Sequence, residues 1–263
     1  MQPTPARFRE LHASGTFIVP NPWDVGSARL LEALGAPALA TTSSGLAATM
    51  GRSDQSVTRD KLVAHVAALT AAVGIPVTVD AERCYAESPP GIAETIDLLA
   101  DAGAAGLSIE DYDPATGAID PIGPATERVA AAAEAAHRRG LVLTARAENH
   151  LYDAGSLQDT LTRVAAYGDA GADCLYAPGP TDLDEIAAIV ALGRPVNVLL
   201  RPGGPTVAEL ATLGVRRVSV GGWLAWTAYG ALAASARELF ETGTISAPVL
   251  GPKDRAVWSE TTR

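Results

Sequence analysis

The stretch that decides the fold is Pro76-Val77-Thr78-Val79-Asp80-Ala81-Glu82. Its apolar run, Val77 to Val79, predicts a buried strand. Two carboxylates, Asp80 and Glu82, follow directly, and side chains two residues apart on an extended chain point to the same side. We therefore expect both carboxylates to face one way at the end of a strand. The alternative is that they are solvated loop residues or caps of the next helix.

A short apolar strand preceded by a helix-ending glycine recurs along the chain. These glycines stand where a left-handed residue ends a helix, and they are Gly35, Gly74, Gly103, Gly140, Gly171, Gly193 and Gly214. With a first strand at Phe17–Val19, the expected strands are Ala38–Thr41, Val77–Val79, Leu107–Ile109, Leu141–Ala145, Cys174–Ala177, Val196–Leu199 and Val218–Val220. Besides a short leading helix, helical patterns occupy Val25–Leu34, Arg59–Val73, Ile92–Ala102, Ala125–Arg139, Leu157–Ala170, Leu183–Leu192, Thr206–Leu213 and Leu224–Phe240.

The alternation of near-continuous apolar strands with helices predicts a parallel sheet covered by helices. Eight such units in a chain of 263 residues match a (β/α)8 TIM barrel. The first turn carries no GxGxxG fingerprint, which argues against a doubly wound dinucleotide-binding fold. We expect a single domain over residues 1–263, in which residues from about 243 to 263 form an extended arm.

Composition excludes several classes of protein. Thirty acidic and twenty basic residues give a net charge of −10, which argues against nucleic-acid binding. No apolar run reaches the length of a membrane span and no signal pattern opens the sequence, so we expect a cytoplasmic protein that does not bind membranes. Cys84 and Cys174 form no CxxC or Cys/His cluster, so neither a disulfide framework nor a zinc site is expected.

Charged residues follow the middle strands, at the end where (β/α)8 barrels carry their chemistry. The carboxylates Asp80, Glu82 and Glu110 offer the oxygen ligands that a hard divalent cation such as Mg²⁺ prefers. Arg146 could hold a carboxylate or a developing oxyanion. Its alternative role is a structural ion pair with a carboxylate such as Glu148.

The segment Ser44-Gly45-Leu46 follows the second expected strand and offers successive backbone N–H groups, which a ligand can approach closely at a glycine. The alternative is an ordinary tight turn. Of the four histidines only His150 follows a strand at this end, so a Ser-His-Asp or Cys-His arrangement has little support.

Seven segments, in order over about residues 7–240, carry a resemblance to one enzyme superfamily: Asn21–Arg29, Thr42–Leu46, Asp80–Glu82, Ser108–Asp111, Ala145–Asn149, Gly171–Gly179 and Pro195–Val198. Together they resemble the isocitrate lyase / phosphoenolpyruvate mutase superfamily, in the branch of oxaloacetate decarboxylases and carboxyphosphonoenolpyruvate phosphonomutases. Members of this superfamily bind Mg²⁺ and an α-oxo or enol carboxylate, and make or break a bond to C3 of a pyruvate unit.

The resemblance implies roles for nine residues. The implied metal-supporting carboxylates, for Mg²⁺ or alternatively Mn²⁺, are Asp80, Glu82 and Glu110, with Asp54 as an additional candidate. The residues implied to hold the oxo-acid are Ser44, Gly45, Leu46, Arg146 and, for a second carboxylate, Asn197. The groups expected to act on the reacting atoms are Arg146, Asp80 and Glu110.

Two segments depart from the superfamily pattern. Arg83-Cys84-Tyr85-Ala86 replaces two glycines after the acidic pair with bulkier residues, which would hinder close approach of the backbone to the substrate. The loop Tyr112–Gly117 lacks the cysteine that the lyases use as an acid, which argues against a true isocitrate or methylisocitrate lyase. It also lacks the basic and amide residues of the phosphonate-handling members.

We therefore expect a Mg²⁺-dependent lyase that cleaves a C–C bond of a small 2-oxo or 2-hydroxy dicarboxylate. The reaction would pass through a pyruvate enolate, as in a decarboxylase or a retro-aldol or Claisen-type lyase, with Mg²⁺ absorbing the enolate charge. The alternatives are P–C bond chemistry on phosphonopyruvate or phosphoenolpyruvate, and a non-catalytic barrel that binds an oxo-acid.

The resemblance also implies a homodimer that exchanges its eighth helix, or a homotetramer made of two such dimers. Aromatic residues favour interface cores, and the start of this helix concentrates Trp223, Leu224, Trp226 and Tyr229. The alternative is that these side chains cover the barrel's own wall. We expect this helix and the arm at Pro248–Pro252 to lie in the interface.

Overall fold

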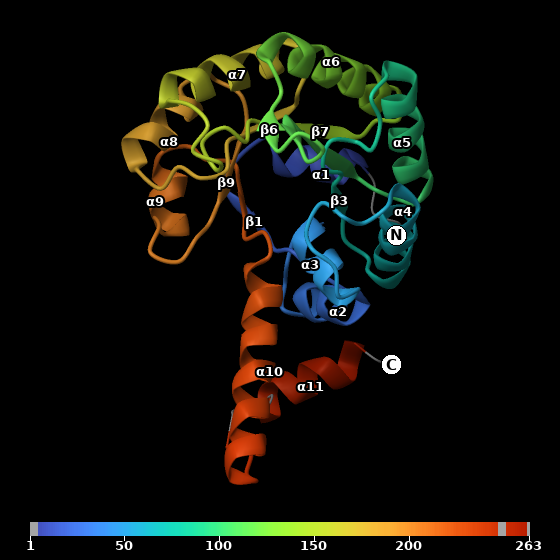
Figure 1. Ribbon diagram of the computed structural model, residues 1–263, viewed down its shortest axis with the longest axis vertical. Coiled ribbons are helices and arrows are strands. Elements are labelled where there is room, and N and C mark those ends of the chain that lie inside the picture. The colour runs from blue at the N-terminus through green and yellow to red at the C-terminus, as the bar shows by residue number, and fades with distance from the viewer. Residues whose placement is uncertain (1–4, 247–250, 262–263) are drawn as a thin grey trace.

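The computed structural model describes residues 5–246 and 251–261 of the chain. Its centre is a sheet of eight parallel strands in the order β1-β10-β9-β8-β7-β4-β3-β2 (Figure 1). The strands are β1 (Phe17–Val19), β2 (Leu39–Ala40), β3 (Val77–Asp80), β4 (Gly106–Glu110), β7 (Val142–Arg146), β8 (Cys174–Tyr176), β9 (Val196–Leu199) and β10 (Arg217–Ser219). Every expected strand is present and ends within one residue of its predicted bounds.

The sheet curls until its two end strands lie side by side. The Ala40 N–H, in β2, donates to the Pro20 carbonyl next to β1 at 3.1 Å, and Asn21 Nδ2 donates to the Thr41 carbonyl at 3.0 Å. The predicted (β/α)8 barrel is therefore confirmed. A short hairpin, β5 (Tyr112–Asp113) with β6 (Ala118–Ile119), follows β4 outside the barrel sheet.

Helices surround the barrel wall (Figure 1). They are α2 (Val25–Ala33), α4 (Arg59–Ala72), α5 (Pro89–Asp101), α6 (Ile122–Arg138), α7 (Leu157–Asp169), α8 (Leu183–Val190) and α9 (Val207–Thr212). Their apolar faces pack on the outer face of the strands, where residues such as Ile96, Leu107 and Leu143 are fully buried. Across the described residues, none of the helices has the length and apolar character that crossing a membrane requires.

Helix α1 (Pro5–Leu11) closes the end of the barrel opposite the strand C-termini. Its Phe8 is fully buried and packs in a cluster with Phe17, Ala105 and Val142, which lie at or near the N-terminal ends of strands. Because Phe8 occupies this position, the barrel interior is sealed from below and is approached from the mouth.

One of the seven predicted helix-ending glycines is not left-handed. Six have φ between 72° and 108°. Gly74 does not have a positive φ, and the residue before it, Val73, is extended. The Gly74 N–H instead donates to Glu32 Oε1 at 2.7 Å, so a side chain of α2 ties down the end of α4.

Two further segments form helices that the sequence did not predict. The segment Ser44–Leu46, for which a tight turn was the alternative to a ligand-binding segment, lies in helix α3 (Ser43–Thr49), because the Thr42 side chain accepts the Gly45 N–H and caps the helix. The arm expected to be extended contains helix α11 (Pro252–Thr261), which packs against α2. Its Pro248 lies outside the described residues.

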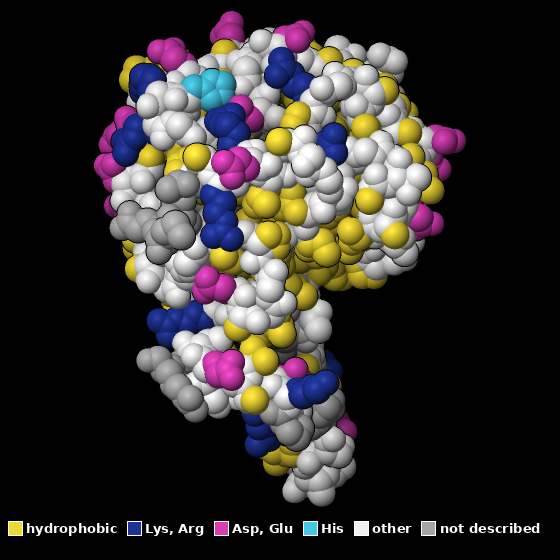
Figure 2. All heavy atoms as spheres, turned by 180° about the vertical axis from the view of Figure 1, so that it is seen from behind, with side chains coloured by type: hydrophobic (Ala, Val, Ile, Leu, Met, Phe, Trp, Pro, Cys, Tyr) yellow, Lys and Arg dark blue, Asp and Glu magenta, His cyan; other side chains and the backbone are white. Residues whose placement is uncertain are grey.

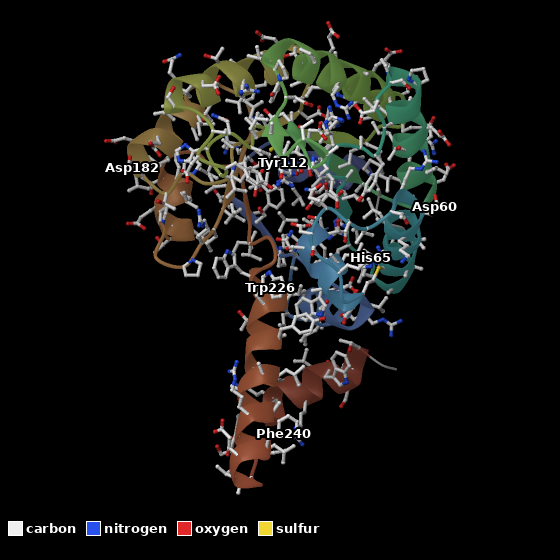
Figure 3. The ribbon with its side chains drawn as sticks, in the orientation of Figure 1. Asp60, His65, Tyr112, Asp182, Trp226 and Phe240 are labelled. Carbon is white, nitrogen blue, oxygen red and sulfur yellow. The ribbon has the colours of Figure 1, made fainter. Side chains whose placement is uncertain are left out.

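Helix α10 (Trp223–Thr242) extends away from the barrel instead of covering it (Figure 1). Of its twenty described residues only Ala225 is buried. Trp226 lies near the base of the helix and Phe240 near its far end (Figure 3), with 51% and 83% of their surface exposed. Hydrophobic side chains also gather on the barrel where it meets the base of α10 (Figure 2).

Candidate active site

Arg146, the last residue of β7, lies at the centre of a group of carboxylates at the barrel mouth. Its Nη1 is 2.8 Å from Asp80 Oδ1 and 3.1 Å from Glu110 Oε2, while its Nε donates to Glu148 Oε1 at 2.6 Å. Glu110 and Arg146 are register partners in adjacent strands, so their side chains share the inner face of the sheet. The structural ion pair with Glu148 considered from the sequence is thus present, together with two more carboxylates.

Arg146 is in contact with three carboxylates at the mouth, and repulsion between carboxylates raises the free energy of their ionised forms. Burial, with the charges of Asp80 and Asp54, raises the pKa of Glu82 to about 8. Burial also raises the pKa of Glu110 well above its usual range, although Arg146 beside it acts in the opposite direction. A divalent cation bound at the mouth would favour the ionised forms of these carboxylates and so oppose both shifts.

The donor set fits a hard divalent cation. All the charged donors are carboxylate oxygens, and Gln55 Oε1 is buried with no hydrogen-bond partner in the described part of the chain. The Gln55 amide nitrogen donates to Glu110 Oε1 at 2.7 Å, which places its orphaned oxygen beside the same carboxylate. Oxygen-only donor sets of this kind suit Mg²⁺ or Mn²⁺ rather than zinc.

A preformed cage of protein ligands is not present in residues 5–246 and 251–261, where no three His, Cys, Asp or Glu side chains converge closely enough to hold a metal ion. Mg²⁺ in proteins is typically held by one or two carboxylates and keeps several waters. Of the four predicted metal-supporting carboxylates, Asp80 and Asp54 line the cavity at the mouth.

The cavity at the mouth has a volume of about 180 Å³ and extends into the barrel interior. Of the residues predicted to hold metal or substrate, it is lined by Ser44, Asp54, Asp80, Arg146 and Asn197. Those that do not line it are Gly45, Leu46, Glu82 and Glu110. The structure thus gathers the predicted residues at one mouth but places them at two depths, some on the cavity surface and others behind it.

The start of α3 explains why Gly45 and Leu46 lie behind the surface. Their N–H groups are used within the helix cap, by Thr42 Oγ1 at 3.4 Å and by the Thr42 carbonyl at 3.0 Å. The Ser43 N–H donates to Asp80 Oδ2 at 3.1 Å and so fixes the second oxygen of that carboxylate. A side chain on Gly45 would come within 2.6 Å of Thr42 and 3.1 Å of Trp23, so close packing requires glycine there.

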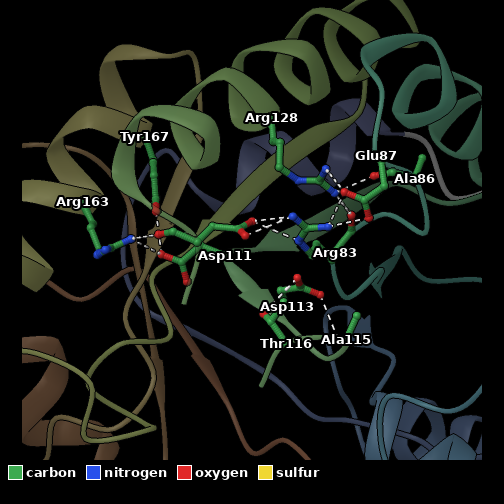
Figure 4. A network of polar contacts seen from close by, with 11 residues as sticks. Arg83, Ala86, Glu87, Asp111, Asp113, Ala115, Thr116, Arg128, Arg163 and Tyr167 are labelled. Carbon is green, nitrogen blue, oxygen red and sulfur yellow. Dashed lines mark hydrogen bonds and ion pairs between the residues drawn. The ribbon is translucent and has the colours of Figure 1, made fainter. Parts of the chain in front are cut away.

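The segment after Glu82 keeps a glycine-like backbone without glycine. Glu82, Cys84 and Tyr85 have φ of 48°, 65° and 55°, a region that costs a non-glycine residue about 1–2 kcal/mol. Arg128 holds the segment by donating from Nη2 to the carbonyls of Arg83 at 2.5 Å and Ala86 at 2.7 Å (Figure 4). The replacement of glycine therefore changes the side chains while the backbone still turns.

Two salt-bridged carboxylates behind the mouth have structural partners. Asp120 binds Arg83 through both oxygens at 3.0 Å. Asp111 accepts the Tyr167 hydroxyl at 2.6 Å and Arg163 at 3.1 Å (Figure 4). It also accepts the Glu148 N–H at 2.8 Å. The Asp111 contacts hold the backbone that carries Glu148, and Glu148 in turn binds Arg146.

An aromatic pair stands beside the mouth. The rings of Tyr112, in β5, and Tyr152, in the loop after β7, stack with their centroids 4.2 Å apart and their planes 3° from parallel. Tyr112 lies over the barrel in Figure 3. The hairpin β5–β6 therefore packs across the loop after β7. This hairpin contains the loop Tyr112–Gly117, which lacks the cysteine that the lyases use as an acid.

Two residues of the mouth were missed by sequence reasoning. Gln55 lies in a loop without any periodic pattern, so no sequence signal points to it. Arg217 lines the inner part of the cavity, and its signal is its spacing of two from Ser219, which gives both side chains the same face of β10.

The barrel and its mouth together define a (β/α)8 barrel with a polar cavity at the C-terminal ends of its strands. The sequence model of the phosphoenolpyruvate phosphomutase family matches residues 8–240. The chain therefore belongs to this family of enzymes, as its motifs predicted.

Individual relatives agree with this assignment. A crystal structure from Burkholderia cenocepacia J2315, provisionally described as a lyase/mutase, is 47% identical and superposes with a TM-score of 0.91 over 97% of this chain and 96% of that one. An uncharacterized protein of Mycobacterium tuberculosis is 38% identical over 81% of each chain. The oxaloacetate decarboxylase of Rhodopseudomonas palustris (strain BisB18) is 30% identical over 71% of this chain and 64% of that protein.

Proposed function

We propose that the protein is a Mg²⁺-dependent lyase that cleaves the C3–C4 bond of a small 2-oxo dicarboxylate, with oxaloacetate as the first candidate. The observation that carries this proposal is the arrangement of Arg146 with Asp80 on the surface of the cavity at the barrel mouth, beside oxygen donors only. The oxaloacetate decarboxylase among the relatives supports the choice of substrate.

Decarboxylation suits the groups at this mouth because it needs no base. The C3–C4 bond breaks and CO2 leaves, while the electron pair of that bond forms a C2=C3 double bond and the π pair of the C2 oxo group moves onto its oxygen to give an enolate. A proton from water then adds to C3 and gives pyruvate. No cysteine or histidine of the described residues lines the cavity, so a reaction without a side-chain base fits what is present.

The residues at the mouth divide this work. Asp80 and Asp54 would hold Mg²⁺, which when bound would act as a Lewis acid toward the oxo group and the developing enolate. Arg146 supplies fixed N–H donors toward the substrate, because Glu148 and Glu110 hold its guanidinium in place. The Ser43 N–H keeps Asp80 in position.

The test is turnover of a panel of 2-oxo and 2-hydroxy dicarboxylates and phosphonopyruvate, with pyruvate and inorganic phosphate as separate readouts. Pyruvate from oxaloacetate in the presence of Mg²⁺, above the rate of Mg²⁺ alone, is the expected result. Phosphate release from phosphonopyruvate with no C–C cleavage would replace this proposal with P–C chemistry.

We also propose that the enzyme assembles as a homodimer in which α10 is exchanged. Ile18 points outward from β1 and is 41% exposed, because the chain's own eighth helix extends away and leaves this part of the wall uncovered. The exposed apolar residues of α10 need a partner surface of the same kind. A second copy offers both halves of the contact, its wall for this helix and its helix for this wall.

A further inference from the structure

An arginine without a carboxylate partner lies inside the barrel. Arg217 opens β10, is only 4% exposed, and lines the inner part of the cavity. Its register partner on β9 is Asn197, the register partner of Asn197 on β8 is Tyr176, and that of Tyr176 on β7 is Arg146. Positions in register on adjacent strands share a face, so Arg217 points into the barrel interior as Arg146 does.

The protein satisfies only part of the hydrogen-bonding capacity of Arg217. Its Nε donates to Asn197 Oδ1 at 2.9 Å, its Nη2 to Thr144 Oγ1 at 2.8 Å, and its Nη1 contacts His12 Nε2 at 3.4 Å. A guanidinium carries five N–H donors. Two of these donors therefore have no acceptor among the described residues.

None of the side chains that contact Arg217 carries a charge. All three partners are neutral, since burial and the charge of Arg217 lower the pKa of His12 to about 3. The His12 Nδ1–H donates to the Phe8 carbonyl, which leaves Nε2 as the acceptor facing Arg217. No ion pair of Arg217 occurs in residues 5–246 and 251–261, whereas Arg146 contacts three carboxylates.

A buried cation that faces a cavity with unused donors is a site for an anion, because an unpaired charge away from water is costly. The planar fork of a guanidinium matches a carboxylate in shape. Small side chains, including Thr78 and Ser108, line the same cavity and leave room between the mouth and Arg217.

We propose that Arg217, with Ser219 beside it, forms a carboxylate-binding subsite at the inner end of the cavity. It would take the carboxylate of a small organic acid that lies farthest from the mouth. The subsite itself rests on the geometry around Arg217, while its use by the substrate of the lyase reaction rests on the proposed function.

The test uses ¹³C-formate as the probe, titrated by NMR into the metal-free protein in the presence of EDTA. Asn197→Asp is the informative variant, because it places a carboxylate 2.9 Å from Arg217 Nε and neutralises the cation from within. Thr144→Val is the matched control, because it removes a neutral acceptor from Arg217 but leaves the charge.

We expect saturable formate binding by the wild type, at least tenfold weaker binding by N197D, and binding by T144V within threefold of the wild type. Equal affinity of N197D and wild type, or no saturable binding by the wild type, would overturn the subsite. If N197D fails to fold, crystals of the wild type soaked in bromide decide the question: an anomalous peak against Arg217 supports the subsite, and its absence there contradicts it.

The outcome is separable from that for the proposed function. Formate binding that N197D weakens, in a protein that fails to cleave any dicarboxylate, retains the subsite and rejects the lyase proposal. If the wild type cleaves oxaloacetate but N197D binds formate as tightly as the wild type, the lyase proposal is retained and the subsite is rejected.

Discussion

His12 makes the stability of the fold depend on acidic pH in a way that can be measured. The residue is 7% exposed, its ring packs between Phe8 and Phe17, and its Nε2 contacts Arg217 Nη1 at 3.4 Å. Burial, followed by the charge of Arg217, lowers its pKa from 6.5 to about 3, while the Phe8 carbonyl and Asp173 act in the opposite direction.

The sign follows from where the proton binds more strongly. Between pH 6.5 and pH 3 the unfolded chain protonates His12 and the folded chain does not, so stability is full above this range and falls as the pH drops through it. With these pKa values, moving from pH 7 to pH 5 costs about 2 kcal/mol of the free energy of unfolding through His12 alone.

The perturbation is His12→Gln, because an amide can donate to the Phe8 carbonyl and accept from Arg217 but does not titrate. Urea unfolding at pH 7 and pH 5, at fixed protein concentration, should show a loss between the two pH values that is about 2 kcal/mol smaller in the variant. Ile96→Val, in a different core cluster, is the control: it should cost about 0.5–1.5 kcal/mol at both pH values. An unchanged pH dependence in H12Q would refute the reasoning.

Three other predictions concern the surface, the mouth and the thiols. Ile18→Arg should place a charge where the partner's α10 packs, so light scattering should find a monomer; an unaltered oligomer contradicts the exchange. Arg128→Ala frees the carbonyls of Arg83 and Ala86, so native trypsin cleavage after Arg83 should become at least tenfold faster, and an unchanged rate would show that other contacts hold the segment. Burial raises the pKa of the Cys84 thiol to about 12, so iodoacetamide at pH 8 should leave turnover intact; rapid inactivation with the fold retained would make this thiol part of the mechanism.

The barrel could be predicted because its strands are short apolar runs and its helices end at glycines. The local misses share a physical cause, which is that one residue type serves two structures. Thr42 and Ser43 are common in turns, yet the Thr42 hydroxyl also caps a helix. Pro252 suggested an extended arm, although proline is equally at home at the first position of a helix.

The site could be predicted in part. Asp80 and Arg146 stand at the ends of strands, where the fold itself identifies them. Which carboxylates reach the cavity could not be predicted, because Glu82 lies in a turn whose left-handed backbone is set by contacts far away in the sequence. Arg217 was missed because a cation at the start of a strand usually lies at the surface, and only closure of the barrel buries it.

The most direct test of the proposed lyase activity is the rate of pyruvate formation from oxaloacetate, measured by coupled reduction with Mg²⁺ present and after EDTA. Asp80→Asn is the paired variant, because the amide keeps the shape of the side chain and removes the charge that holds the cation. We predict that the wild type exceeds the background rate of Mg²⁺ alone by several orders of magnitude, and that EDTA or D80N abolishes the excess. A wild-type rate equal to the background, or a D80N variant as fast as the wild type, would contradict it.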